Sequence, residues 1–438
     1  MTFLNILPPV FVMNLYYTGI GIARNLYGYG VRVYGLSSEK DAPGVKSRFF
    51  DGVYEVPNGR DEPEALYRRL LEIREHYTTP PVIFPTRDFD ILFLHQYREQ
   101  LAPFYRLPQP QDQTIPRILD KLETALVAER CHIPIPKTVV CTSVSDLEEK
   151  SRSLDFPLVV KPRFAYQWRH KGTWEKVGAR KAFLVRAANQ LRDEYRQLTT
   201  VTQEILLQEY IEGEDSDIVV CCCYIDQRGK LLGYFTARKL CQTPPLFGTG
   251  CLVEIVNIPE IISPSVQLLQ AFGYVGLAEI EFKHNKSTNT FSLIEVNPRH
   301  WDQHELGNTV GVNLTWIAYQ HIIGQHIESR SPTYNGRVPC KWIAERELVT
   351  TVIQSVFREI AASQATHSQK ARVRQMSEYC SILKKTAQKF AALLYGQKIF
   401  AVLHARDPLP GFLLCSRIAR ELAKTIVTRM VALIRAKI

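Results

Sequence analysis

The sequence predicts three regions of different fold class: an α/β unit over residues 1–115, an α+β body over 116–330 and a helical, basic region over 331–438. Strand-length apolar segments alternate with helical segments in the first region, which is typical of a parallel sheet. Strand segments outnumber helices in the second region, and basic residues collect in the third. A chain of 438 residues is also too long for one ordinary core, so we expect several domains.

The first region carries strands at about 10–15, 31–36 and 81–85, and helices at about 17–26 and 88–99. Gly19 and Gly21 lie where the first strand turns into its helix. They are only a fragment of the dinucleotide fingerprint, because the third glycine and the acidic residue after the second strand are missing. Tight strand-to-helix packing explains them better, and a substrate pocket at the carboxyl ends of these strands stays open.

The second region begins with helices near 117–129 and 145–154 and continues mainly as strands. We expect these strands at 158–161, 182–186, 206–210, 218–224, 231–240, 276–283 and 291–297. The last two flank a polar gap, 284–290, which indicates a hairpin with substantial antiparallel sheet behind it.

The hairpin carries the most informative polar residues of the chain. Side chains two apart in a strand share a face, so Glu279 pairs with Glu281, and Glu295 with Asn297, beside Arg299. Clustered carboxylates repel each other unless a cation lies among them, and hard oxygen ligands suit Mg²⁺ carrying the phosphates of a nucleotide. Surface acids on a solvated strand pair are the alternative.

Two further segments are weak signals when taken singly. An apolar strand delivers Lys161 just before Pro162, where a compact cation can reach an anionic ligand. The strand at 206–210 passes into an acidic turn, 212–217, which is either a solvated loop or a set of acceptors for ribose hydroxyls.

Taken in order, these motifs resemble the ATP-grasp superfamily over roughly residues 116–325. The matching pieces are Lys161-Pro162, Gln208-Glu209-Tyr210-Ile211, Glu281 and the run Ile294-Glu295-Val296-Asn297-Pro298-Arg299. Arg238-Lys239-Leu240 with the following prolines and glycines is similar to the carboxylate–amine ligase branch that includes D-aspartate ligases. The first region resembles the Rossmann-like domain that precedes the grasp body.

The resemblance implies a body of two subdomains with ATP between them, and it implies a role for each motif residue. Lys121 and Lys161 would hold the phosphates of ATP, and Gln208, Glu209 and the backbone of Ile211 would meet adenine. Asp215, or else Asp217, would bind ribose. Glu281, Glu295 and Asn297 would hold two Mg²⁺ ions, with Mn²⁺ as a substitute. Arg299 and Arg238, together with Lys239, would stabilise the phosphoryl group in flight and the acyl phosphate.

One segment departs from the resemblance. The loop over the phosphates is commonly rich in glycine, but residues 166–178 hold only Gly172 and Gly178, and they carry four cationic or imidazole side chains. We therefore expect cationic side chains to meet the phosphates, with Trp168 or Trp174 shielding the site.

The function that follows is an ATP-dependent ligase that phosphorylates a small carboxylic acid to an acyl phosphate and couples it to an amine, forming an amide. Carboxylation through carboxyphosphate and a non-catalytic ATP-binding adaptor are the alternatives. The base that accepts the amine proton is left open among His300, Asp302, His304 and Glu305.

The distribution of charge indicates which surface the C-terminal end of the chain can contact. Residues 361–438 hold 14 Lys and Arg against 3 Asp and Glu, so the net charge of +10 belongs to this end. The apolar residues of 411–438 recur at helical spacing among arginines, which fits either a helix on an anionic membrane surface or one packed on the protein. We expect no nucleic-acid partner.

The location of the protein is predicted from its cysteines and from targeting signals. The sequence has ten cysteines without a Cys-x-x-Cys pair, no evident signal peptide and no apolar run long enough to span a bilayer. These features predict a cytoplasmic protein, which would be peripheral at the inner membrane face if the helix binds lipid.

Overall fold

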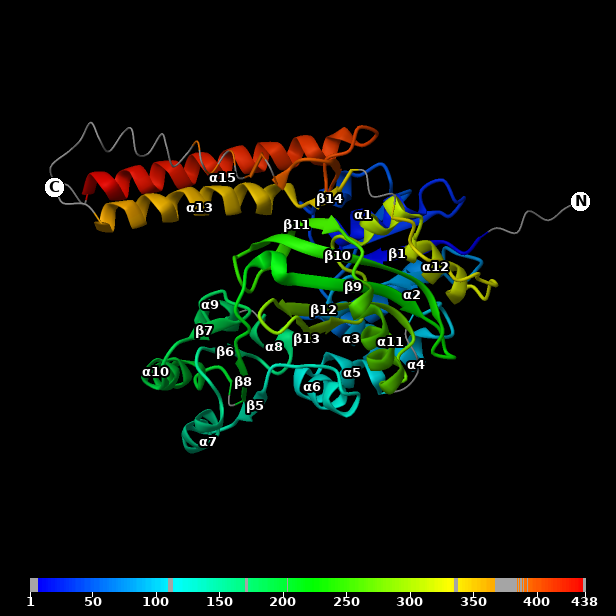
Figure 1. The fold of residues 1–438 in the computed structure, drawn as a ribbon. Coiled ribbons are helices and arrows are strands. Elements are labelled where there is room, and N and C mark those ends of the chain that lie inside the picture. The colour runs from blue at the N-terminus through cyan, green and yellow to red at the C-terminus, as the bar shows by residue number, and fades with distance from the viewer. Residues whose placement is uncertain are drawn as a thin grey trace, which may run out of the picture.

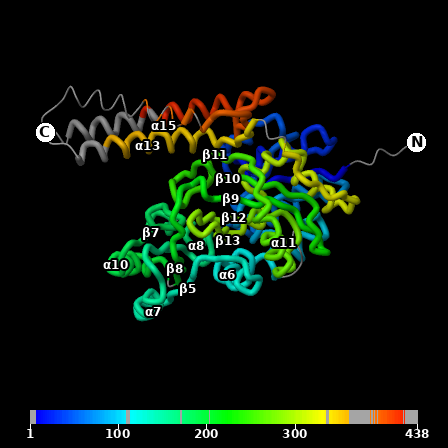
Figure 2. Tube along the Cα trace, viewed as in Figure 1, coloured from blue at the N-terminus to red at the C-terminus, as the bar shows by residue number. Residues whose placement is uncertain are grey.

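The structure is a computed structural model (Figures 1 and 2). It describes residues 7–435 except 109–112, 170–171, 203, 335–337, 367–383, 385, 387, 389 and 392. Three sheets organise the described chain, of four, seven and four strands.

The first sheet is parallel, as predicted for the N-terminal region. Its strand order is β3-β2-β1-β4, with β1 at Val10–Met13, β2 at Val33–Ser37, β3 at Gly52–Glu55 and β4 at Val82–Phe84. The helices of this region are α1 (Tyr17–Leu26), α2 (Pro63–Arg74), α3 (Asp88–Gln96) and α4 (Arg98–Leu101). The strand order reverses between β1 and β4, and in open α/β sheets ligands bind outside the carboxyl ends of the strands at such a point. Asn14, just after β1, donates to the Thr86 hydroxyl, just after β4, over 3.2 Å.

The central sheet has the order β13-β12-β9-β10-β11-β14-β15 and is antiparallel except for the last pair. Its strands are β9 (Ile218–Ile225), β10 (Leu231–Thr243), β11 (Thr249–Ile255), β12 (Gly276–Asn285), β13 (Thr290–Asn297), β14 (Cys340–Ile343) and β15 (Gln397–Phe400). One face packs on the N-terminal region and α12 (Leu314–Ile322). The other face packs on α5 (Thr114–Leu119), α6 (Lys121–Arg130) and α11 (Ile262–Ala271).

The three consecutive cysteines of β9 show how the strand period divides these two cores. Cys222 lies in the core on the N-terminal side, whereas Cys221 and Cys223 lie in the opposite core. All three are fully buried. They act as small apolar side chains in the two cores, because successive residues of a strand point to opposite faces.

The third sheet forms a smaller subdomain with its own core. Its order is β5-β8-β6-β7, with β5 at Thr138–Cys141, β6 at Leu158–Lys161, β7 at Phe183–Val185 and β8 at Ile205–Glu209. The helices α7 (Val144–Lys150), α8 (Ala165–Trp168), α9 (Thr173–Lys176) and α10 (Ala188–Leu198) belong to this subdomain. Figure 1 shows it beside the β12–β13 end of the central sheet.

The C-terminal region is helical but is not a separate appendage. Its helices α13 (Glu345–Thr366) and α15 (Pro408–Arg435) lie side by side and project beyond the body (Figure 1), and Arg346 Nε meets Glu421 Oε2 at 2.9 Å between them. Its strands β14 and β15 extend the central sheet from β11. Neither strand was predicted from the sequence, and β14 pairs with β11 and β15, which are both distant from it along the chain.

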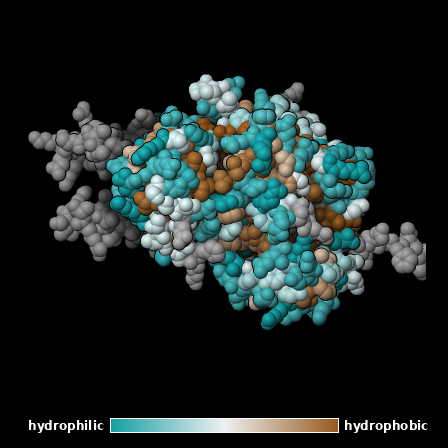
Figure 3. Space-filling model, turned by 90° about the horizontal axis from the view of Figure 1, so that it is seen from below, coloured by the Kyte–Doolittle hydropathy of each residue, from teal (hydrophilic) through white to brown (hydrophobic). Residues whose placement is uncertain are grey.

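The start of α15 packs on the protein, as one of the two alternatives for 411–438 expects. Leu414 is buried and Ile418 packs against the core, whereas Leu409, Phe412 and Leu413 are exposed. The side chains of residues 424–435 lie outside the described part, and membrane contact stays a prediction. Among the described helices, none combines the length and apolar character that crossing a bilayer requires. On the face of the molecule shown in Figure 3, hydrophilic residues predominate and hydrophobic residues appear in patches toward the middle.

Candidate active site

A cavity of about 360 Å³ lies where the three sheets meet. Its walls come from β6 and β8 of the small subdomain, from β10, β12 and β13 of the central sheet, and from the loops after β1 and β4. Most of the predicted site residues line it: Lys121, Lys161, Gln208, Glu209, Ile211, Asp215, Lys239, Glu281, Glu295, Asn297 and Arg299.

The acidic strip lies on the paired strands β12 and β13, as the hairpin predicts. Glu281 stands opposite Glu295 and Glu279 stands opposite Asn297 in the antiparallel register. The Asn297 amide nitrogen donates to Glu279 Oε2 at 3.0 Å and to Glu281 Oε1 at 3.4 Å. Three carboxylates and one amide therefore gather at one end of the hairpin.

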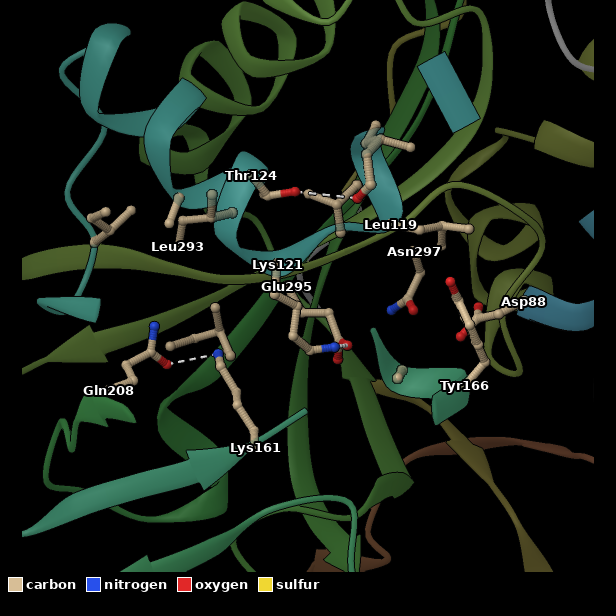
Figure 4. A pocket seen from close by; sticks show the side chains of 16 residues that line it. Asp88, Leu119, Lys121, Thr124, Lys161, Tyr166, Gln208, Leu293, Glu295 and Asn297 are labelled. Atoms are coloured by element: carbon tan, nitrogen blue, oxygen red, sulfur yellow. Dashed lines mark hydrogen bonds and ion pairs between the residues drawn. The ribbon is translucent and has the colours of Figure 1, made fainter. Parts of the chain in front are cut away.

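Lysines from two other elements neutralise part of this strip. Lys239 Nζ on β10 lies 2.6 Å from Glu281 Oε1, and Lys121 Nζ at the start of α6 lies 2.5 Å from Glu295 Oε1 (Figure 4). The Asp120 carboxylate caps α6 by accepting from the backbone N–H groups of residues 122 and 123, which fixes where Lys121 begins the helix. Burial opposes ionisation of Glu295, but the attraction of Lys121 outweighs it and lowers the pKa of this carboxyl.

Lys161 is a buried lysine of the cavity wall. Its Nζ donates to Gln208 Oε1 at 2.8 Å (Figure 4). The Gln208 amide nitrogen donates in turn to the Thr138 hydroxyl at 2.8 Å. Burial, and then the repulsion of Lys121, lower the pKa of Lys161 to about 7. A bound polyanion would raise the pKa of Lys161 again. Its negative charge compensates for the hydration that Lys161 has lost, and it shields Lys161 from the positive charge of Lys121.

The strip also fits divalent metal ions by the chemistry of its donors. Burial and the neighbouring Glu281 raise the pKa of Glu279 to about 8, so an added cation would relieve charge crowding here. Among the described residues no three His, Cys, Asp or Glu side chains form a ready metal cage. The predicted donors are two carboxylates and an amide, which leave coordination positions for phosphate oxygens and water, the usual arrangement for Mg²⁺.

Arg299, directly after the strip, connects the central sheet to the N-terminal region. Its Nε donates to Asp88 Oδ1 at 2.7 Å, and its Nη2 donates to Asn297 Oδ1 at 3.2 Å. Burial opposes ionisation of Asp88, but the Arg299 guanidinium outweighs it and lowers the pKa of that carboxyl. The guanidinium is thus held at the cavity wall, next to the predicted metal ligands.

The residues predicted to meet adenine lie together in the cavity wall. Gln208, Glu209 and Ile211 follow one another along β8 and its exit, and Val159 and Ile294 add apolar lining. Alternating backbone polar groups beside apolar side chains can bind a flat heteroaromatic ring.

Asp215 lines the cavity but already has partners. Its carboxylate accepts from the Gln242 backbone and side-chain nitrogens at 2.8 and 2.9 Å and from the Leu246 backbone at 3.1 Å. It therefore fixes the loop after β10 as well as bordering the site.

Two predicted site residues lie outside the cavity lining. Asp217 is bound to Lys286 Nζ at 2.6 Å and to the backbone of Glu214. Arg238 stands opposite Val219, whose side chain belongs to the core on the other face of the sheet. Lys239 faces the cavity, so its neighbour Arg238 points away, and the structure does not support a direct catalytic contact by Arg238.

Several cavity residues were not predicted. Asp88 comes from α3, and Thr18 from α1 donates to Asp302 Oδ1 at 2.6 Å. Lys181 Nζ, just before β7, meets the Thr249 hydroxyl at 2.5 Å, and burial, followed by Arg169, lowers the pKa of Lys181 to about 8. These residues lie at helix starts or in loops, where no periodic pattern marks them.

The described part of the segment 166–178 includes the end of α8 and the helix α9, and it borders the cavity. Trp168, Arg169 and Trp174 line the cavity, and Trp168 is nearly fully buried. Arg60 of the N-terminal region donates to the backbone carbonyl of Arg169 at 2.8 Å. His170 and Lys171 lie outside the described residues.

Comparisons with known proteins agree with this geometry. A family model described as "Carbamoyl-phosphate synthase L chain, ATP binding domain" matches residues 256–329. The D-aspartate ligase of Enterococcus faecium (strain Aus0004) is 22% identical over 319 residues, which cover 69% of this chain and 72% of that protein. The D-alanine–D-alanine ligase of Pseudomonas fluorescens (strain Pf0-1) is 31% identical over 189 residues, 41% of this chain and 53% of the relative.

The fold is similar to that of solved structures as well. The biotin carboxylase domain of the 2-oxoglutarate carboxylase of Hydrogenobacter thermophilus, solved with MgADP and bicarbonate, aligns with a TM-score of 0.60 at 16% identity, over 76% of this chain and 73% of that one. The shared fold, the order of the motif residues around one cavity and the matches in sequence agree with the resemblance of this chain to the ATP-grasp superfamily and its carboxylate–amine ligases.

Proposed function

We propose that this chain is an ATP-dependent ligase that converts a carboxylate to an acyl phosphate and couples it to an amine, forming an amide. One observation carries the proposal most: Glu281, Glu295 and Asn297 lie at one end of a hairpin, beside Arg299 and Lys239, in a cavity that also holds Lys121 and Lys161. A protein that only binds ATP has little need for so many charged groups where a phosphoryl group would be transferred.

The chemistry follows from charge. A carboxylate resists attack because of its own negative charge and because oxide is a poor leaving group, and ATP supplies the phosphoryl group that removes both obstacles. Glu281, Glu295 and Asn297 would hold Mg²⁺, whose chemistry is to bridge phosphate oxygens and neutralise their charge. Lys121 and Lys161 would bind phosphates, and Arg299 with Lys239 would stabilise the charge that develops on the transferring group. Trp168 and Trp174 would exclude water, which otherwise hydrolyses the acyl phosphate.

The binding of adenine, ribose and metal is assigned to other residues of the same cavity. Gln208, Glu209 and the backbone of Ile211 would bind adenine, and Asp215, which lines the cavity, is a better ribose ligand than Asp217, which does not. We propose Mn²⁺ as a metal that can replace Mg²⁺, since both accept hard oxygen ligands.

The substrates are a small carboxylic acid and an amine. The relatives are named for D-aspartate and D-alanine, so these two acids are the first to test. Release of ADP and phosphate should require both an acid and an amine, and mass spectrometry should find their amide. Release that requires bicarbonate instead would favour carboxylation, and no release with any mixture would leave an ATP-binding adaptor.

Glu295→Ala tests the mechanism separately from the substrates. We expect turnover to fall at least about 100-fold, as for the loss of a metal that stabilises transition-state charge. Glu204→Ala is a suitable control, because Glu204 pairs with Arg163 outside the cavity lining. Near-normal turnover of Glu295→Ala would remove this glutamate from the mechanism.

A further inference from the structure

The cavity reaches beyond the predicted nucleotide contacts to the carboxyl edge of the N-terminal sheet. Asn14, Tyr16 and Thr18 line it there, together with Thr86 and Asp302. Asn14 has φ of 67°, a left-handed conformation that is costly for a residue with a side chain and that clusters at functional sites. This edge also contains the point where the strand order reverses. Ligands of open α/β sheets bind at such a point, so a second substrate can bind against this edge.

The carboxylates of the cavity differ in what holds them. Asp88, Glu281 and Glu295 each meet a cationic side chain, at 2.7, 2.6 and 2.5 Å. Three others accept from N–H groups: Asp215 from Gln242 and Leu246, Glu209 from the backbone of Asp155, and Glu279 from the amides of Asn297 and Gln303.

Asp302 is different. Within the described chain its hydrogen-bond partner is a single neutral hydroxyl, that of Thr18, which donates to Oδ1 at 2.6 Å. Oδ2 accepts no hydrogen bond from the described residues, and the residue is only partly buried at the cavity wall. A carboxylate with a free oxygen in a cavity is suited to bind an ammonium group from a ligand.

The structure also separates Asp302 from the other three residues that the sequence leaves open as the base. His300 and His304 are 2% and 1% exposed and do not line the cavity, and burial lowers the pKa of each. Glu305 is also absent from the lining and lies 3.5 Å from Arg24. A general base must come within hydrogen-bond reach of the proton that it removes, and of these four residues Asp302 is the one at the cavity wall.

We propose that Asp302, oriented by Thr18, forms the amine subsite of this enzyme: it binds the ammonium group of the second substrate and accepts its proton. The substrate class is a primary amine that is protonated in solution. This inference rests on the proposed ligase function and adds to it the position from which the amine attacks.

Amide formation at this subsite combines a proton transfer with the displacement of phosphate. Asp302 takes one proton from the ammonium nitrogen, and the neutral amine uses its lone pair to form the C–N bond at the carbonyl carbon of the acyl phosphate. The C–O bond to phosphate breaks, phosphate leaves with that electron pair, and the second proton lost from nitrogen goes to the departing phosphate. Asp302 then returns its proton to solvent.

A purely structural role for Asp302 is the competing explanation, because its bond to Thr18 also joins the central sheet to α1. Asp302→Asn keeps the shape and the acceptor for Thr18 but removes the charge. Hydroxylamine discriminates between the two roles, since it is largely uncharged at neutral pH and traps an acyl phosphate as a hydroxamate without a base.

The test uses the full-length chain with MgATP, D-aspartate or D-alanine as the acid, and either hydroxylamine or a panel of amino acids as the amine. We expect Asp302→Asn to form hydroxamate near the wild-type rate and to lose amide formation by about 100-fold or more, the usual size of a general-base contribution. Raising the pH should restore amide formation in the variant, because more of the free amine is then neutral. Among the described residues, the titratable groups that interact with Asp302 are Arg299, His304 and Tyr17. All three are kept unchanged when the pH dependence of wild type and Asp302→Asn is compared.

Glu347→Gln is the matched control. Glu347 accepts from Tyr17 of the same helix α1 at 2.5 Å but does not line the cavity, so both reactions should survive its substitution. Thr18→Val should weaken amide formation without affecting hydroxamate. If Asp302→Asn loses both products, or keeps both, the proposal is overturned while the ligase function stands. If the wild-type chain forms neither product, the proposed function fails and this inference fails with it.

Discussion

Two neighbouring residues, Arg238 and Lys239, show how a single step along a strand separates a site residue from a structural one. Lys239 is 4% exposed and meets Glu281 in the cavity, whereas Arg238 points to the opposite face of β10. We expect Lys239→Met to lower turnover by about 100-fold or more, since a cation beside a transferring phosphoryl group stabilises its charge. Arg238→Met should keep most of the turnover.

ADP release under saturating substrates measures both variants, and circular dichroism checks that each is folded. The reverse result, with Arg238→Met inactive and Lys239→Met active, would show that the strand presents its other face to the substrate.

The same period explains which site residues could be predicted from the sequence. Glu281, Glu295 and Asn297 could be predicted, because alternation within two adjacent strands defines the face on which their side chains lie without any knowledge of the fold. Asp88, Lys181 and Thr18 were not, because each reaches the cavity from an element whose position depends on packing between regions. Arg238 was assigned by resemblance, which gives the strand but not its face.

At the scale of elements, a clear apolar pattern decided which strands could be predicted, whereas β11 (Thr249–Ile255), although seven residues long, was missed. The apolar runs of β6, β9 and β12 were predicted nearly to their ends, because each shows a continuous or alternating apolar pattern. The edge strand β15 has two exposed residues among its four, so its sequence alone does not distinguish it from a loop. Its place in the sheet is fixed by a distant contact instead: Arg24 of α1 donates to the carbonyls of Phe400 and Val402 at 2.8 and 2.7 Å.

This anchor of β15 predicts an unusual pH dependence of stability. Glu305, beside Arg24, is buried, and desolvation outweighs the attraction of Arg24 and raises the pKa of Glu305 to about 7. In the unfolded chain the pKa is near its ordinary value of about 4.3, so between these values the folded state binds more protons. Stability from this group is therefore complete below about pH 4.3 and is lost as the pH rises through about 7, by roughly 4 kcal/mol in all.

Glu305→Gln should remove this slope, because glutamine has the same shape and does not titrate. Urea denaturation at several values between pH 5 and 8 measures it, with Glu347→Gln as a control that should keep the wild-type slope. Parallel curves for wild type and Glu305→Gln would show that Glu305 does not titrate in this range.

At the scale of the whole molecule, the cavity is the place where the three sheets meet, and its contacts cross between them. Lys121 and Glu295 join α6 to the central sheet, Asp88 and Arg299 join the N-terminal region to it, and Lys181 meets Thr249 from the small subdomain. The free cavity keeps Lys121 and Lys161 close enough to repel each other. A nucleotide bound here should therefore stabilise the whole described fold and not one domain alone.

We expect MgATP at about 100 times its dissociation constant to stabilise the folded chain by about 2.7 kcal/mol, because a ligand that binds only the folded state adds RT ln(1 + [L]/Kd). Thermal unfolding should then shift as one transition, since the walls of the cavity belong to all three sheets. Lys161→Met should lose most of the shift at the same nucleotide concentration, because it removes a buried partner for the phosphates. Arg238→Met, which alters a cation outside the cavity, should retain the shift. A shift that is equal in Lys161→Met and wild type, or one confined to a single partial transition, would mean that the nucleotide binds elsewhere than between these sheets.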